Sequence, residues 1–225
     1  MIPLTIILVE CGLELIPKKI RNHPSIKKGL KINNYASQLL DTALHHSVMK
    51  TLKDFEKRGR PDILHACLLN ALGSPLNKSG FLTTYIHTIN GKIFKIAPKL
   101  RITRNYNRFK GLMAKLLIDG RIGIEGTELI SPFVGSLEEL IQSHKNKQLA
   151  IFSSKGKKIT PSDKFFTLTS DKETITIIGG FQKNTFSSQL LKLTNNILSL
   201  SSFSLDAWIA ISRLLSYFEI ASGVY

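Results

Sequence analysis

Residues 59–65 read Gly59-Arg60-Pro61-Asp62-Ile63-Leu64-His65, and the chain continues through Leu68-Leu69-Asn70-Ala71-Leu72-Gly73 to Ser74-Pro75-Leu76-Asn77-Lys78-Ser79-Gly80. Pro61 suits the first turn of a helix, where its missing N–H is not needed. The apolar residues that follow cover most of a helix circumference, which predicts a buried helix ending near Gly73. Arg60 and Asp62 would then lie on a rigid element at the edge of a core, which is how a site for an anionic substrate is built. The alternative is a solvated Arg and an Asp that only favours the helix dipole.

The composition is that of a well-packed, basic protein. Its 225 residues are 43% hydrophobic, and 31 Lys and Arg against 16 Asp and Glu leave a net charge of +15. We therefore expect a single α/β domain over residues 1–225 and a polyanionic partner, nucleic acid before an anionic membrane. No apolar run approaches the ~20 residues of a membrane span, so we expect no membrane partner. Cys11 and Cys67 lack metal-ligand spacing, which predicts no metal and a reducing, cytoplasmic location.

Patterning in the first half of the chain predicts a buried strand, a basic connection, a helix and a hairpin. The β-branched run from Leu4 to Val9 is typical of a central strand in a parallel sheet. Six Lys and Arg residues between Lys18 and Lys31 are interpreted as a solvated loop, in preference to a specific RNA contact. Residues 34–53 have leucines near helical spacing and predict one helix. Strand-forming residues on both sides of Asn90-Gly91 predict a β-hairpin over residues 81–97.

A second informative stretch carries Arg101, Arg104 and Arg108, spaced at i, i+3 and i+7. If the stretch is helical, the three side chains share a face. If it is a loop before a helix that begins near Asn107, the arginines still project near a helix N-terminus, which favours phosphate. Arg suits bidentate phosphate contact and stacking on bases. An ordinary exposed basic face is the alternative.

The third informative stretch lies in the last third of the chain. Strands are predicted at 148–153, 173–178 and 196–200, with Gly179-Gly180 after the second strand and a Ser-rich loop after the third. In open α/β folds, ligands bind at the carboxyl edge where such parallel strands end. A helix capped by Ser204 is predicted over 205–220. It is apolar over too much of its surface for one-sided burial, so a partner subunit or another element should cover its second side.

Taken together, these stretches resemble a known enzyme family. The matching residues are Arg60-Pro61-Asp62-Ile63-Leu64-His65, Ser74-Pro75-Leu76-Asn77-Lys78-Ser79-Gly80, Tyr85-Ile86-His87-Thr88, Arg101-Ile102-Thr103-Arg104 with Arg108-Phe109, Ile178-Gly179-Gly180-Phe181 and Leu205-Asp206-Ala207-Trp208. The chain resembles the SPOUT-class methyltransferases of ribosome biogenesis that act on N1 of a pseudouridine in small-subunit, 16S-type ribosomal RNA. Its length indicates an archaeal-type member.

The resemblance implies a trefoil-knotted, parallel-sheet α/β fold, a homodimer, and S-adenosylmethionine bound in a knot over about 148–225. It also implies an α/β elaboration over about 55–135 that binds RNA. Arg60 would act in catalysis with Asp62, as the acidic partner that holds the arginine or as a general base. The implied RNA contacts are Arg60, Arg101, Arg104 and Arg108. The implied cofactor contacts are Phe152, Gly179, Asn184, Leu200, Ser201, Ser202, Phe203, Ser204 and Leu205.

One departure from the family pattern keeps other functions open. After the first glycines the family usually has a small residue or His and then Gly-Asp or Gly-Lys, whereas Gln182-Lys183-Asn184 stands here. A non-catalytic assembly factor of the same fold that binds ribosomal RNA is therefore an alternative. A methyltransferase of this fold acting on another nucleotide is a third possibility.

Overall fold

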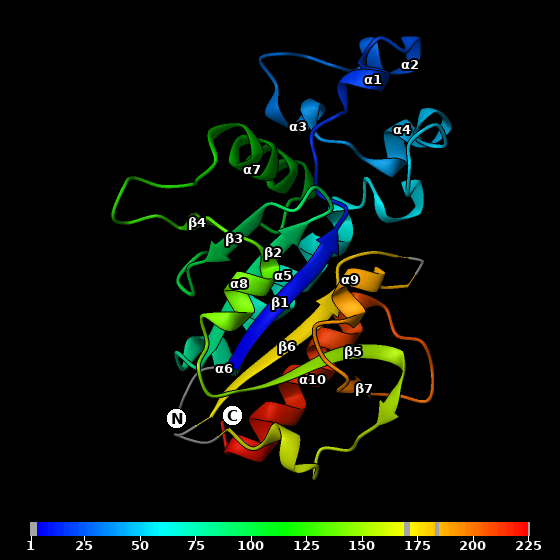
Figure 1. Cartoon of the computed structure of the whole chain (residues 1–225). Helices are drawn as coiled ribbons and strands as arrows, with labels where there is room; N and C mark the ends of the chain where they lie inside the picture. The colour runs from blue at the N-terminus through cyan, green and yellow to red at the C-terminus, as the bar shows by residue number, and fades with distance from the viewer. Residues whose placement is uncertain (1–3, 169–171, 183–184, 225) are drawn as a thin grey trace.

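The computed structural model describes residues 4–168, 172–182 and 185–224 of the chain. Within these residues, seven strands form one sheet in the order β4-β3-β2-β1-β6-β5-β7 (Figure 1). The strands are β1 (Leu4–Cys11), β2 (Leu82–Thr88), β3 (Ile93–Ile96), β4 (Ile130–Phe133), β5 (Lys147–Lys158), β6 (Glu173–Gly179) and β7 (Ile197–Ser199). The five strands from β2 to β7 in this order are parallel, and β3 and β4 are antiparallel additions at one edge. The predicted α/β class with a mostly parallel sheet is confirmed.

Strand β1 lies at the centre of the sheet, as its β-branched run predicted. All eight of its residues are buried, and it pairs in parallel with β2 on one side and β6 on the other. Alternate side chains point to opposite faces. Leu4, Ile6 and Leu8 join one apolar cluster, whereas Ile7 and Val9 join a second. Helices therefore cover both faces, which explains why the strand is a continuous apolar run.

The helices form two covering layers and a separate lobe. They are α1 (Lys18–Arg21), α2 (Pro24–Lys27), α3 (Tyr35–Gln38), α4 (Thr42–Met49), η1 (Phe55–Lys57), α5 (Pro61–Gly73), α6 (Pro75–Lys78), α7 (Tyr106–Asp119), α8 (Leu137–Gln142), η2 (Lys164–Phe166), α9 (Ser188–Leu191) and α10 (Ala207–Ser222). Side chains of α5, α7 and α10 fill the first cluster, and those of α8 and α9 fill the second. The predicted helix from Pro61 to Gly73 and the predicted β2–β3 hairpin are confirmed. None of the helices in the described ranges is long and apolar enough to cross a membrane.

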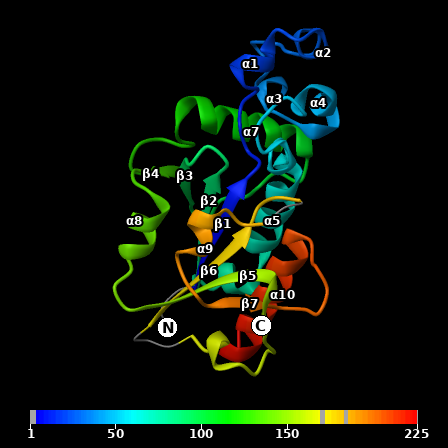
Figure 2. The same ribbon diagram turned by 45° about the vertical axis from the view of Figure 1, so that its right-hand side comes forward.

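Residues 13–58, which we call the N-terminal lobe, stand beyond the carboxyl end of β1 (Figures 1 and 2). The lobe has its own apolar cluster, built from Ile16, Ile20, Ile26, Leu40, Val48, Met49 and Leu52. The prediction of one helix over 34–53 is wrong, because the chain is extended between α3 and α4. There the N–H of Leu40 donates to the carbonyl of Glu14, and the N–H of Ile16 donates to that of Gln38. Asp41 then caps α4 through its side chain.

The last helix also differs from its prediction. Helix α10 begins at Ala207 after Asp206, so Ser204 is not its cap. It packs against α5 through its buried side, whereas Ile209 and Ile220 are 46% and 56% exposed, so its own chain provides only part of the expected cover. The helix therefore closes the core of its own chain while its first turns reach the site described next.

Candidate functional site

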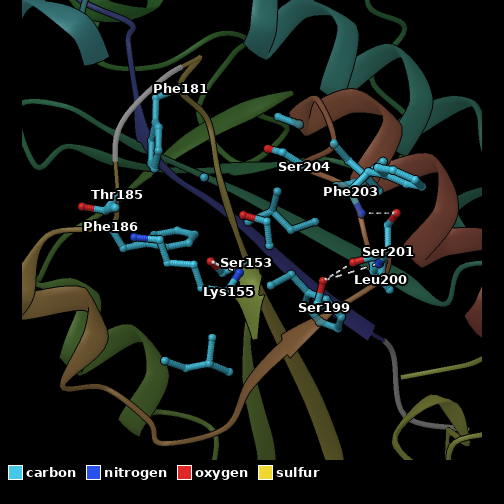
Figure 3. Close-up of a pocket in the computed structure, with 18 of the residues that line it drawn as sticks. Ser153, Lys155, Phe181, Thr185, Phe186, Ser199, Leu200, Ser201, Phe203 and Ser204 are labelled. Atoms are coloured by element: carbon cyan, nitrogen blue, oxygen red, sulfur yellow. Dashed lines mark hydrogen bonds between the residues drawn. The ribbon is translucent and has the colours of Figure 1, made fainter. Parts of the chain in front are cut away.

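A pocket of about 400 Å³ opens at the carboxyl ends of β6 and β7, beside the bend of β5 (Figure 3). Both strands are parallel to β5, so their ends lie at one edge of the sheet. The described residues that line the pocket are Phe152, Ser153, Ser154, Lys155, Ile178, Gly179, Phe181, Gln182, Thr185, Phe186, Leu191, Ile197, Ser199, Leu200, Ser201, Phe203, Ser204, Leu205, Ala207 and Ala210. An apolar pocket with a few polar groups at this edge is typical of a small-molecule site.

The structure brings seven of the nine predicted cofactor residues to this pocket. They are Phe152, Gly179, Leu200, Ser201, Phe203, Ser204 and Leu205. Ser202 is not among the lining residues, and its hydroxyl accepts a hydrogen bond from Nζ of Lys158 at 2.8 Å. Asn184 lies outside the described residues. The role of all nine in binding a cofactor stays a prediction.

Sequence reasoning named Phe152 of β5 but missed the residues that follow it, which reach the pocket through a local departure from strand pairing. Phe152 pairs with Leu198, but the next pair along β5 is Lys157 with the same Leu198. The intervening residues leave the ladder, as in an enlarged bulge, and three of them line the pocket. Gly156 permits the return, because a Cβ there would lie 2.6 Å from the Leu198 backbone nitrogen. No pattern in the sequence of β5 alone indicates this, since it depends on the neighbouring strand.

The loops around the pocket are fixed by short local contacts. Gly180 packs against Cys11 so closely that a Cβ would overlap the Cys11 sulfur and lie 3.1 Å from its Cα. The close packing of the two chain segments therefore requires a glycine at this position. In the loop after β7, Oγ of Ser199 donates to the carbonyl of Ser201 at 2.8 Å (Figure 3). Oγ of Ser201 accepts from the N–H of Phe203 at 3.0 Å. Serine hydroxyls thus replace backbone partners in this turn.

Arg60 lies at the start of α5 and reaches the edge of the pocket. Its Nε donates to Oδ1 of Asp62 at 2.8 Å and its Nη2 donates to Oδ2 at 2.6 Å, a bidentate pair. Its Nη1 donates to the side-chain carbonyl of Gln182, a residue of the pocket lining. Hydrogen bonding to Asp62 raises the pKa of the Arg60 guanidinium above its ordinary value. The guanidinium is therefore fixed in place and charged beside the pocket.

The second arginine stretch is a loop followed by a helix, so one of the two arrangements left open is confirmed. Helix α7 begins at Tyr106, after Asn105, whose side chain accepts from the N–H of Arg108. Arg101 and Arg104 precede the helix, and all three arginines are exposed. His65 of α5 anchors this loop: its Nε2 donates to the carbonyl of Thr103 at 2.7 Å. Residues 101–105 and Arg108, which we call the arginine loop, therefore lie next to α5, whose N-cap residue is Arg60.

Asp41 joins the N-terminal lobe to the start of α7. It is 4% exposed, and its Oδ2 accepts from Nζ of Lys110 at 2.9 Å and from the hydroxyl of Tyr106 at 3.1 Å. Burial raises the pKa of Tyr106 well above its ordinary value, and the negative charges of Asp41 and Asp62 raise it further. Tyr106 therefore stays protonated and lies within the field of the Arg60–Asp62 pair.

A second contact ties the segment before Arg60 to the pocket. Glu10, at the end of β1, has a left-handed backbone with φ of 51° and pairs with Nζ of Lys57 at 2.7 Å. Nζ of Lys57 also lies 4.8 Å from the centroid of the Phe181 ring, which lines the pocket. A non-glycine residue with this backbone carries strain, which is often found at functional sites. Residues 57–60 thus contact the pocket loop twice.

Among the described residues, the remaining reactive side chains do not form a second chemical site. In the described part of the chain, no three His, Cys, Asp or Glu side chains are placed to hold a metal. Cys11 and Cys67 are buried free thiols, and burial raises the pKa of both. His87 accepts the N–H of Glu10 through Nδ1, which is a structural contact like that of His65.

A pocket for a small molecule, joined through Arg60 to an arginine-bearing surface, is typical of α/β enzymes that use a cofactor on a phosphate-bearing substrate. Residues 6–219 match the family described as EMG1/NEP1 methyltransferase. The chain is 39% identical to the ribosomal RNA small subunit methyltransferase Nep1 of Staphylothermus marinus, over 95% of this chain and 94% of that protein. It is 38% identical to the protein of the same name from Thermococcus kodakarensis, over 98% and 100%.

A solved structure agrees with these relatives. The crystal structure of Archaeoglobus fulgidus Nep1 bound to S-adenosylhomocysteine matches with a TM-score of 0.83 and 34% identity, over 98% of this chain and 99% of that one. The chain therefore belongs to the EMG1/NEP1 methyltransferase family, as the sequence motifs indicated.

Proposed function

We propose that this protein transfers a methyl group from S-adenosylmethionine to small-subunit ribosomal RNA during ribosome assembly. Family membership, the names of the relatives and the S-adenosylhomocysteine in the related crystal structure support this. The observation that carries the proposal is the contact of Arg60 with Gln182. It joins a charged surface suited to RNA with a pocket suited to the methyl donor.

The pocket fits the proposed donor in size and chemistry. Its volume of about 400 Å³ lies within the range of ligand pockets. Phe152, Leu200 and Phe203 supply apolar surface for a purine ring, and the lining serines Ser153, Ser154 and Ser204 supply hydroxyl groups. When bound, S-adenosylmethionine supplies an electrophilic methyl group on a positively charged sulfur. Among the described lining residues only Lys155 is charged, so the other lining side chains provide shape and hydrogen bonds.

The proposed target atom is N1 of a pseudouridine, as the family resemblance implies. The N1 proton passes to water, the ring nitrogen attacks the methyl carbon, and the carbon–sulfur bond breaks with its electron pair on sulfur. Arg60 stabilises the negative charge that develops on the ring as the proton departs. Arg101, Arg104 and Arg108 hold flanking phosphates and the extruded nucleotide. Alignment of the reacting atoms supplies the remaining rate enhancement.

Asp62 acts by orienting Arg60. Both carboxylate oxygens of Asp62 already accept from the guanidinium, at 2.8 and 2.6 Å, which favours this role over that of a general base. Asp62→Asn tests it with a pseudouridine-containing oligonucleotide. We expect weaker RNA binding and a methylation rate at saturating RNA within about tenfold of the parent, because one hydrogen bond to Arg60 remains. A loss of two orders of magnitude or more in that rate, with RNA affinity intact, would support the base role.

The target atom itself is tested by comparing pseudouridine and uridine in the same RNA. In uridine N1 is bonded to the sugar, so we expect methylation, detected by mass spectrometry, only with pseudouridine. Undiminished transfer to uridine would contradict the N1 assignment and favour another nucleotide.

Calorimetric titration with S-adenosylmethionine tests the alternative of a non-catalytic assembly factor, which the Gln182 to Asn184 segment keeps open. That alternative requires no binding of the donor.

The proposal includes the larger organisation that the resemblance implies. This consists of a single SPOUT-like domain with a trefoil knot over about 148–225, RNA contacts over about 55–135, a homodimer and a cytoplasmic location. Ile209 and Ile220 on α10 are 46% and 56% exposed, which gives apolar surface for a second copy. Light scattering at micromolar concentration checks the homodimer, and a monomeric mass would contradict it.

A further inference from the structure

The sequence from residue 15 to residue 40 contains no Asp or Glu but six Lys and Arg residues: Lys18, Lys19, Arg21, Lys27, Lys28 and Lys31. All five lysines are exposed and Arg21 is partly buried. In the described part of the chain, the ion pairs within 4.0 Å include none of the six. We call these six residues the lobe cations. Their positive charge is therefore not neutralised by the protein itself.

The lobe cations are presented by a folded platform. Ile20 of α1 and Ile26 of α2 are 3% and 1% exposed and pack in the apolar cluster of the N-terminal lobe. Nε of Arg21 donates to the carbonyl of Ile16 at 2.8 Å, which fixes α1 on that cluster. Because the apolar side chains point inward, the lysines beside them point outward. This arrangement presents the five exposed lysines on the outside of the lobe.

The N-terminal lobe that carries the lobe cations packs against α7, next to the arginine loop. Val9 of β1 pairs with Gly179, so the lobe leaves the sheet at the level of the pocket. Asp41 of the lobe binds Tyr106 and Lys110 of α7, whose first turn carries Arg108. Figures 1 and 2 both show the lobe beside α7, away from the carboxyl end of α10. An RNA bound at the arginine loop would therefore lie beside the N-terminal lobe.

The chemistry of the lobe cations identifies what they bind. Five of the six are lysines, which act as point charges on phosphate, and no Phe, Tyr or Trp lies between residues 15 and 34 to stack on a base. The arginine loop differs, with Tyr106 and Phe109 beside its arginines. Lysines without aromatic neighbours suit the backbone of a paired RNA stem, whose bases are hidden.

We propose that the N-terminal lobe is a second RNA-binding surface, which holds the phosphates of a helical stem next to the nucleotide bound at Arg60. This rests on the proposed function and goes beyond it, because the lobe supplies affinity and register while the arginine loop and the pocket supply the chemistry. An anionic membrane is the competing partner for a basic lobe with exposed Ile32 and Leu44. The position of the N-terminal lobe next to the arginine loop favours RNA over a membrane as its partner.

Two matched triple variants test the proposal. The lobe variant carries Lys18→Gln, Lys27→Gln and Lys28→Gln. The control variant carries Lys145→Gln, Lys164→Gln and Lys172→Gln, exposed lysines near the amino ends of β5 and β6. Both variants lose three positive charges, so any difference between them is local rather than an effect of net charge. All six side chains are exposed, so thermal unfolding should change little in either variant.

Binding is measured by fluorescence anisotropy with a hairpin RNA that has a stem of roughly 15 base pairs and a pseudouridine in its loop. We expect the lobe variant to bind this hairpin roughly ten- to a hundredfold more weakly near 0.15 M salt, with a salt slope smaller by about two to three. The control variant should stay within about twofold, and both should bind the isolated loop RNA like the parent. Equal affinities of the two variants for the hairpin would overturn the proposal.

Methylation and vesicle binding separate the remaining outcomes. With the hairpin, the lobe variant should show a raised KM and an unchanged kcat, and it should bind S-adenosylmethionine like the parent. If the parent transfers no methyl group, the proposed function fails while the binding comparison still tests the lobe. Binding of the parent, but not of the lobe variant, to phosphatidylserine vesicles, with hairpin affinity unchanged, would assign the lobe to membranes and overturn the proposal.

Discussion

The contact of Asp41 with Lys110 gives a prediction that can be worked from the structure. The side chains of Asp41 and Lys110 are 6% and 8% exposed, and their charged atoms lie 2.9 Å apart. Breaking a buried ion pair by removing one partner costs about 3–5 kcal/mol, because the other charge is left without compensation. Asp41→Asn retains one side-chain oxygen that can still cap α4, while its NH2 group replaces the oxygen that accepts from Lys110 and Tyr106.

We therefore expect Asp41→Asn to lower the free energy of unfolding by about 3 kcal/mol or more, a large part of the 5–15 kcal/mol typical of a domain. Lys110→Met, which keeps the length of the apolar stem, should also destabilise the protein. The double variant should recover much of the loss, because neither unpaired charge remains buried. Urea unfolding at pH 7.5 measures all four proteins. A loss below about 1 kcal/mol for Asp41→Asn, or strictly additive effects, would refute the reasoning.

Three further predictions follow from burial and close packing. Burial lowers the pKa of His45 and His87, and each accepts a backbone N–H through Nδ1, so the folded protein needs both rings neutral. The unfolded chain binds protons below about pH 6.5, so the unfolding free energy should fall there by up to about 1.4 kcal/mol per pH unit for each histidine. Urea unfolding at pH 7.5 and 5.5 checks this, and a flat profile would contradict it. Gly180→Ala should lower the free energy of unfolding by about 1–3 kcal/mol and weaken S-adenosylmethionine binding in calorimetry, because its Cβ overlaps Cys11. Gly73→Ala adds a Cβ with no atom within 4 Å, so it should have neither effect. The two buried cysteines should resist iodoacetamide until the protein unfolds, since burial raises their thiol pKa; rapid native alkylation would contradict this.

The features that the sequence predicted correctly depend on neighbouring residues. Helix α5 has Pro61 at its first turn and an apolar run behind it, and the hairpin has an Asn-Gly turn between strand formers. Strand β1 is buried along its whole length and mostly apolar because helices cover both faces of the sheet. In each case the local signal and the tertiary environment agree, which is why pattern reasoning succeeds there.

The features that it missed depend on residues far apart in the chain. The break between α3 and α4 exists because Gln38 and Leu40 bond to the backbone of residues 14–16. The bend of β5 exists because two of its residues pair with the same Leu198. Arg60 and Asp62 were selected from their motif, but the contact of Arg60 with Gln182 joins residues 122 positions apart. No local pattern in the sequence contains that contact.

Under the proposed function, Gln182 takes part in two binding equilibria, that of the methyl donor and that of RNA. Its side chain lines the pocket and at the same time accepts from the guanidinium of Arg60. If a molecule that enters the pocket displaces that side chain, Arg60 loses one hydrogen-bond acceptor. Its Nη1 group is then free to donate to RNA. The two affinities are then thermodynamically linked: the factor by which the donor changes the affinity for RNA equals the factor by which RNA changes the affinity for the donor. If that factor strengthens binding, S-adenosylhomocysteine left in the pocket keeps the methylated RNA bound. If it weakens binding, the same product favours release of the RNA.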